Sequence, residues 1–94
     1  MLLNINDACT IADIVRTAQG NQPVTRLLDG GRVISGTARA IVKDDSGASF
    51  LGATDDVRDG YLWVTTVMGF EEFWPMSEVM ELVGSGELAL NYRA

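Results

Sequence analysis

Asp59–Pro75 read DGYLWVTTVMGFEEFWP, and this stretch predicts a β-strand that is apolar on both of its faces. Side chains alternate between the two faces of a strand. The two sets are Tyr61, Trp63 and Val67 on one side, and Leu62, Val64 and Met68 on the other. A small domain normally buries one face of an antiparallel strand. We therefore expect an N-terminal helix or a partner chain to cover the second face.

The segment after this strand returns along it and then becomes helical. Gly69 allows a tight turn, and Phe70–Trp74 predict a second strand with aromatic side chains on both faces. Pro75 ends that strand and suits the first turn of a helix. Apolar residues then recur at helical spacing until Gly84, where we expect the helix to stop. A final strand is predicted over Glu87–Tyr92.

The chain before this stretch predicts one helix followed by short strands. An apolar stripe indicates an amphipathic helix over Asp7–Gln19. Strands are expected at Val24–Leu28, Arg32–Lys43 and Ala48–Ala53, and Asp29-Gly30-Gly31 forms the turn between the first two.

The strand predicted over Arg32–Lys43 has a regular alternation of side chains. The residues expected to share one face are Ile34, Gly36, Ala38, Ala40 and Val42. Small side chains on this face leave room for a helix or for the bend of a barrel strand. Gly36 is the position at which we expect a bulge or bend.

These elements predict an α+β fold in one domain over residues 1–94. We expect an N-terminal amphipathic helix packed on a small, strongly bent antiparallel sheet of about five strands, with a short helix before the last strand. The stretch EEFWPMSEVMEL, residues 71–82, resembles the strand, short helical turn and strand that close SH3-like barrels. This resemblance implies an SH3-like barrel; an open sheet with the helix packed across it is the alternative.

The composition argues against most catalytic and metal chemistry. The chain has no histidine and one cysteine, which removes His-based acid/base catalysis and the usual zinc sites. The adjacent carboxylates of Glu71 and Glu72 point to opposite faces of a strand and cannot converge on one substrate atom. We expect no enzyme activity, no catalytic residues, no cofactor and no metal.

The chain is expected to be a soluble, cytoplasmic protein that does not bind nucleic acid. It has no run of the roughly 18 apolar residues that a membrane span requires, and the N-terminus lacks the basic and apolar regions of a signal peptide. A net charge of −6 disfavours contact with nucleic-acid phosphates. Most acidic side chains come after residue 43, and they predict an acidic surface of Asp55, Asp56, Asp59, Glu71 and Glu72.

The functional hypothesis is a protein-protein interaction module that uses an aromatic surface on its sheet. The predicted partner-binding residues are Tyr61, Trp63, Phe70, Phe73 and Trp74. A homodimer is the simplest way to cover the second apolar face of the strand. The alternative is a small acidic inhibitor or accessory protein, of the kind found in phages and mobile elements, that occupies a basic surface of a larger target.

Overall fold

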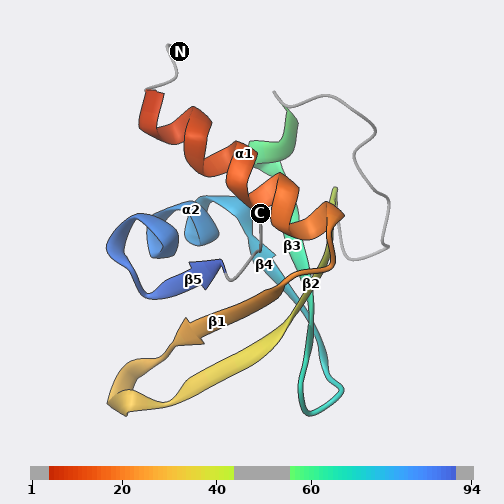
Figure 1. Ribbon diagram of the computed structural model, residues 1–94, viewed down its shortest axis with the longest axis vertical. Helices are drawn as coiled ribbons and strands as arrows, with labels where there is room; N and C mark the ends of the chain where they lie inside the picture. The colour runs from red at the N-terminus through yellow and green to blue at the C-terminus, as the bar shows by residue number, and fades with distance from the viewer. Residues whose placement is uncertain (1–4, 44–55, 91–94) are drawn as a thin grey trace.

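The computed structural model describes residues 5–43 and 56–90 and consists of two α-helices and one β-sheet (Figure 1). The bounds of the elements are α1 Ile5–Gln19, β1 Pro23–Leu27, β2 Val33–Val42, β3 Tyr61–Thr66, β4 Glu71–Pro75, α2 Met76–Ser85 and β5 Leu88–Leu90. Short 3-10 turns precede β2 at Asp29–Gly31 and β3 at Asp56–Asp59. The strand predicted over 48–53 and the end of the last predicted strand, 91–92, lie outside the described residues.

The five strands form one antiparallel sheet in the order β4-β3-β2-β1-β5. This result confirms the predicted α+β class with an antiparallel sheet; α2 directly precedes β5 in the chain. Strands β4 and β5 are the two edges of the sheet and do not pair with each other, so the sheet is open. Within the described residues, no helix has the length and apolar character needed to cross a membrane.

Helix α2 continues past the predicted stop. We expected it to end at Gly84, but it extends to Ser85, and Gly86 forms the C-cap with a φ of 82°. This left-handed conformation suits glycine, and the Gly86 N–H donates to the Val83 carbonyl at 3.3 Å. Gly84 therefore lies inside the helix.

Both helices contribute to the buried cluster on one face of the sheet. Helix α1 supplies Ile11, Ile14 and Ala18, and α2 supplies Met76 and Val79. The strand residues of the same cluster are Val24, Ala38, Ile41, Leu62, Val64, Trp74 and Leu88. We call the sheet face that carries these strand residues the core face.

A β-bulge in β2 makes the predicted face of Ala40 and Val42 wrong. Ala38 is the Cα partner of Val64, but the next paired residue of β2 is Ala40, which lies opposite Trp63. Arg39 is thus an extra residue in the ladder, and it reverses the alternation after it. Ala40 and Val42 consequently lie on the face opposite the core face.

Gly36 marks a close approach between β2 and β3 rather than the bulge itself. A Cβ atom placed on Gly36 would lie 2.7 Å from the Thr65 carbonyl oxygen and 2.8 Å from Val64 Cγ1. Real Cβ contacts are not this short, so a side chain at this position would push the two strands apart. The bulge predicted at Gly36 lies instead three residues further along, at Arg39.

Candidate interaction surface

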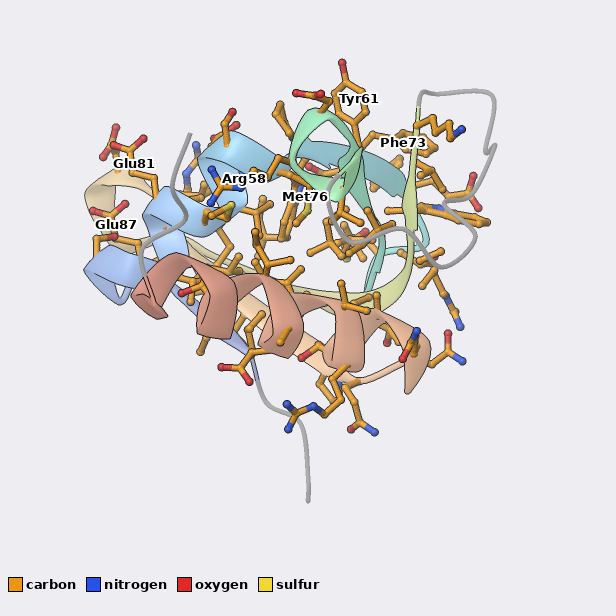
Figure 2. All side chains as sticks on the ribbon, turned by 90° about the horizontal axis from the view of Figure 1, so that it is seen from above. Arg58, Tyr61, Phe73, Met76, Glu81 and Glu87 are labelled. Atoms are coloured by element: carbon orange, nitrogen blue, oxygen red, sulfur yellow. The ribbon has the colours of Figure 1, made fainter. Side chains whose placement is uncertain are left out.

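The sheet face that points away from the core cluster is the candidate site, and we call it the outer face. Strand pairing assigns to it Thr25, Leu27, Val33, Ser35, Thr37, Arg39, Ala40, Val42, Tyr61, Trp63, Thr65, Glu71 and Phe73. Val67 extends β3 by one residue, because its N–H donates to the Ser35 carbonyl at 3.0 Å. Figure 2 shows Tyr61 and Phe73 on the side of the molecule away from α1, with Met76 pointing inward.

Two of the predicted aromatic residues form a pair on the outer face. Trp63 and Phe73 are Cα partners on β3 and β4, and their rings stack with centroids 6.1 Å apart and planes inclined by 16°. Tyr61 lies on the same face of β3, opposite Pro75. All three aromatic side chains are half-buried. This part of the predicted surface therefore comes together as one aromatic group.

Within residues 5–43 and 56–90, the indole N–H of Trp63 has no hydrogen-bond partner, although the atom is buried. A buried donor without a partner costs about 1–3 kcal/mol. Val42, which lies opposite Tyr61 on the same face, has 0% exposure. This end of the outer face is thus well packed.

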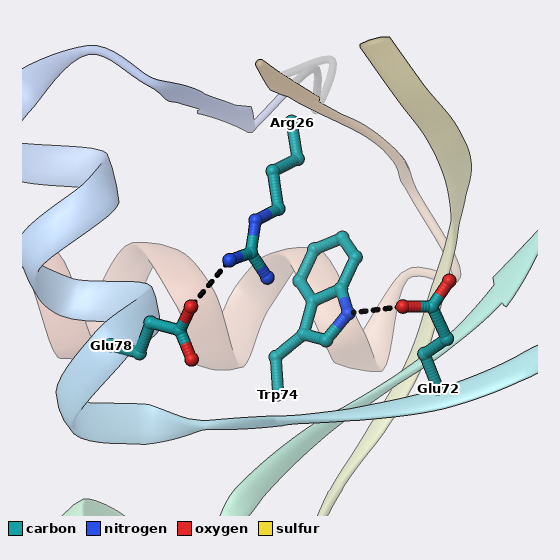
Figure 3. A network of polar contacts seen from close by, with 4 residues as sticks. All are labelled: Arg26, Glu72, Trp74 and Glu78. Carbon is teal, nitrogen blue, oxygen red and sulfur yellow. Dashed lines mark hydrogen bonds and ion pairs between the residues drawn. The ribbon is translucent and has the colours of Figure 1, made fainter. Parts of the chain in front are cut away.

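Trp74 belongs to the core instead of the aromatic surface. It is 3% exposed and shares the core face with Leu62, its Cα partner. Its Nε1–H donates to Glu72 Oε1 at 3.2 Å, and the Arg26 guanidinium carbon lies 5.1 Å from the centroid of the indole ring (Figure 3). Arg26 also forms an ion pair and hydrogen bond with Glu78 of α2. Trp74 is therefore not part of the outer face.

Arg26 was not among the residues predicted to matter. The sequence does contain an indication that Arg26 has a structural role, because Arg26 and the apolar Val24 share one face of the same predicted strand. A charged residue in phase with a core residue indicates a partner inside the fold. That partner, Glu78, lies 52 residues further along the chain, so the sequence does not identify it.

Phe70 is exposed but lies on the opposite side of the sheet from Tyr61, Trp63 and Phe73. Its N–H donates to Thr66 Oγ1 at 3.1 Å, and its carbonyl accepts the Thr66 N–H at 2.8 Å. These bonds close the β3–β4 hairpin, and Phe70 has the same strand phase as Trp74. Its side chain is 67% exposed at the end of the core face.

Three exposed apolar residues of the outer face were not predicted as partner-binding. Leu27 and Val33 are Cα partners on β1 and β2, with exposures of 49% and 54%, and Val67 is 76% exposed. The signal that could have found Leu27 and Val33 is their position next to the Asp29-Gly30-Gly31 turn, out of phase with the core residues of their strands.

The predicted acidic residues do not form one surface among those that the structure describes. Asp55 and the side chain of Asp56 lie outside the described part, and Asp59 is exposed directly before β3. Glu71 lies on the outer face, while Glu72 lies on the core face and accepts the Trp74 hydrogen bond. Adjacent strand positions separate these two carboxylates, as the sequence indicated.

The polar centre of the outer face consists of Arg39, Thr65 and Glu71. Thr65 is the Cα partner of Glu71 on one side, and on the other side its Oγ1 accepts a hydrogen bond from Arg39 Nε at 3.1 Å. Arg39 and Glu71 are both exposed. A positive and a negative side chain thus lie on either side of one threonine.

Across residues 5–43 and 56–90, no group of three or more His, Cys, Asp or Glu side chains is placed to hold a metal ion. In comparisons with known proteins, no family model matches the chain, and no curated protein or solved structure shows significant similarity to it.

Proposed function

We propose that this chain is a small non-enzymatic interaction module that self-associates through the outer face of its sheet. The observation that carries this proposal is the exposure of Leu27, Val33 and Val67 on the face opposite the core cluster. Large apolar side chains gathered on one exposed face are typical of a surface that binds another protein. The stacked pair of Trp63 and Phe73 adds rigid aromatic area to the same face.

The charge of the outer face favours a second copy as the partner. The chain carries a net charge of −6, so two copies repel each other through most orientations. Among the described strand residues of the outer face, the charged side chains are Arg39 and Glu71, and their charges cancel. The described strand residues of this face therefore add no net charge to a contact between two copies. A two-fold dimer uses the same surface on both copies.

The expected association is moderate. Fully burying a Val or Leu side chain contributes about 1.5–3 kcal/mol, but these side chains are already partly covered in the single chain. A two-fold contact buries each side chain that it covers twice, once in each copy, while bringing two bodies together costs about 4–15 kcal/mol. We expect a dissociation constant of about 1–100 μM.

The test compares two exposed apolar residues from one hairpin that lie on opposite faces. Sedimentation velocity over a concentration series is run on the unchanged chain, on Val67→Ser and on Phe70→Ser. Phe70 is the matched control, since it is 67% exposed but has the phase of the core face. We expect Val67→Ser to weaken association and Phe70→Ser to leave it unchanged, although phenylalanine is the larger side chain. A chain that stays monomeric up to millimolar concentration, or a larger effect of Phe70→Ser, would overturn the proposal.

The salt dependence separates self-association from the alternative acidic inhibitor. Salt screens the repulsion between two copies of net charge −6, so self-association should weaken less with rising salt than binding to a basic target. An inhibitor that binds a basic target would bind less tightly under the same change. Glu71 and Glu72 point to opposite faces, which favours the first of these two functions.

We further propose that the sheet is an open variant of the SH3-like barrel. Two features support this: β1 pairs with both β2 and β5, so the last strand returns to the first, and the bulge at Arg39 bends β2. A solved structure with a flat, unbent β2 would contradict it.

A further inference from the structure

We propose that the two copies pair about a two-fold axis that runs along β3 at Thr65, so that Arg39 of each copy meets Glu71 of the other. This inference rests on the proposed self-association and adds its geometry. Thr65 lies at the centre, with Glu71 of β4 on one side and the Arg39 side chain of β2 on the other.

The strand spacing makes this surface complementary to itself. Neighbouring strands are about 4.8 Å apart, so the strands that carry Arg39 and Glu71 lie at equal distances on the two sides of β3. Arg39 is the bulge residue between the pairs Ala38–Val64 and Ala40–Trp63, and its side chain reaches back to Thr65, the Cα partner of Glu71. Rotation by 180° about an axis along β3 therefore brings this guanidinium over β4 of the other copy, near the level of Glu71. Each guanidinium then faces a carboxylate of the other copy, and one arrangement creates two ion pairs. An axis across the strands would instead bring each Arg39 to the other Arg39.

Arg39 is oriented for such a contact within the single chain. Its Nε–H donates to Thr65 Oγ1 at 3.1 Å, which holds the guanidinium over β3. The side chain is exposed, and the remaining guanidinium N–H groups can donate to a carboxylate in the two-pronged geometry that arginine favours. The ion pairs within the described residues join Arg16 to Asp13 and Arg26 to Glu78, and Arg39 takes part in neither.

The same axis places apolar residues against their own symmetry mates. Trp63, Thr65 and Val67 follow one another on the outer face of β3. An axis along this strand brings each of them opposite the same residue of the second copy. The two sheets are then stacked with their strands aligned, which is a common way for sheets to pack face to face. Trp63 and Val67 consequently lie on the two sides of the central ion pairs, and Leu27 lies at the margin of the contact because this axis places β1 beyond the edge strand β4 of the other copy.

The experiment uses charge reversal in two single variants, Arg39→Glu and Glu71→Arg. Each variant alone places like charges at both central contacts, and we expect self-association to weaken by about tenfold or more. A mixture of the two variants restores opposite charges at the central contacts, because the reversed side chain of one variant faces the oppositely reversed side chain of the other. We therefore expect the mixture to form a heterodimer about as strong as the original homodimer. Sedimentation velocity of each variant and of the equimolar mixture measures this.

Two charge-matched controls lie on the helices. Arg16→Glu in α1 and Glu81→Arg in α2 change the net charge by the same amounts at exposed positions away from the outer face. Both should leave self-association nearly unchanged. If the original chain dimerises but the two reversals behave like these controls, or if their mixture does not pair, the proposed axis is wrong and the proposed function stands. If the original chain does not associate at all, both proposals fail.

Discussion

The Arg26 guanidinium lies over the indole ring of Trp74, with 5.1 Å between its central carbon and the ring centroid. The two residues belong to β1 and β4, and two other strands lie between these in the sheet. Both side chains lie on the core face of the sheet, where Arg26 has Ile34 as its neighbour on β2 and Trp74 has Leu62 as its neighbour on β3. The contact therefore joins two strands that are not neighbours in the sheet, and Arg26 covers part of the Trp74 ring, which is 3% exposed.

Removing Arg26 should destabilise the chain more than removing its ion-pair partner. We expect Arg26→Ala to lower the free energy of unfolding by about 1–3 kcal/mol, because it loses a charged hydrogen bond and the cover over Trp74. Glu78→Gln should cost less than about 1 kcal/mol, since glutamine still accepts a hydrogen bond and the Glu78 side chain is 43% exposed. Urea denaturation of both variants measures the difference. Equal losses would show that the ion pair, and not the cover over the ring, is what stabilises this region.

The two tryptophans should respond differently to truncation. Trp74 is 3% exposed in the core, so Trp74→Ala should cost about 3–5 kcal/mol, and Trp74→Phe should cost less and keep the fold measurable. Trp63 is half-buried on the outer face, and Trp63→Ala should cost less stability while weakening self-association. Urea denaturation and sedimentation velocity, applied to the three variants, check both properties. A larger loss of stability from Trp63→Ala than from Trp74→Ala would contradict the assignment of the two faces.

The sequence predicted the elements well because each has a local signal. Alternation along β3 indicated a strand with two apolar faces, and Pro75 marked the change from β4 to α2. The stacking of Trp63 on Phe73 follows from the tight turn at Gly69, which sets their register. Such features depend on residues close together in the chain.

Features that depend on distant contacts were not predictable in the same way. The sequence alternates regularly through Arg39 and gives no sign of the bulge there, so the faces of Ala40 and Val42 were predicted wrongly. Trp63 and Trp74 each belong to a strand with apolar side chains on both faces, so the alternation does not show which tryptophan is buried. The helices pack on the face that carries Trp74. Long-range packing decides which apolar face of a strand becomes the core.

Two glycine substitutions should have effects of opposite sign. At Gly36, a new Cβ would lie 2.7 Å from the Thr65 carbonyl oxygen, and backbone on the neighbouring strand cannot yield without disturbing the ladder. Gly36→Ala should therefore destabilise the chain by about 1–3 kcal/mol. Gly84 lies inside α2 with open space around it, and Gly84→Ala should stabilise by about 0.5–1 kcal/mol, because alanine loses less backbone entropy in a helix.

Thermal and urea denaturation of the two variants, at a chain concentration below the onset of association, provide the measurement. Gly84→Ala also serves as the control for Gly36→Ala, since both add one methyl group to the same chain. A neutral or stabilising Gly36→Ala would mean that β2 and β3 lie further apart than the 2.7 Å contact requires.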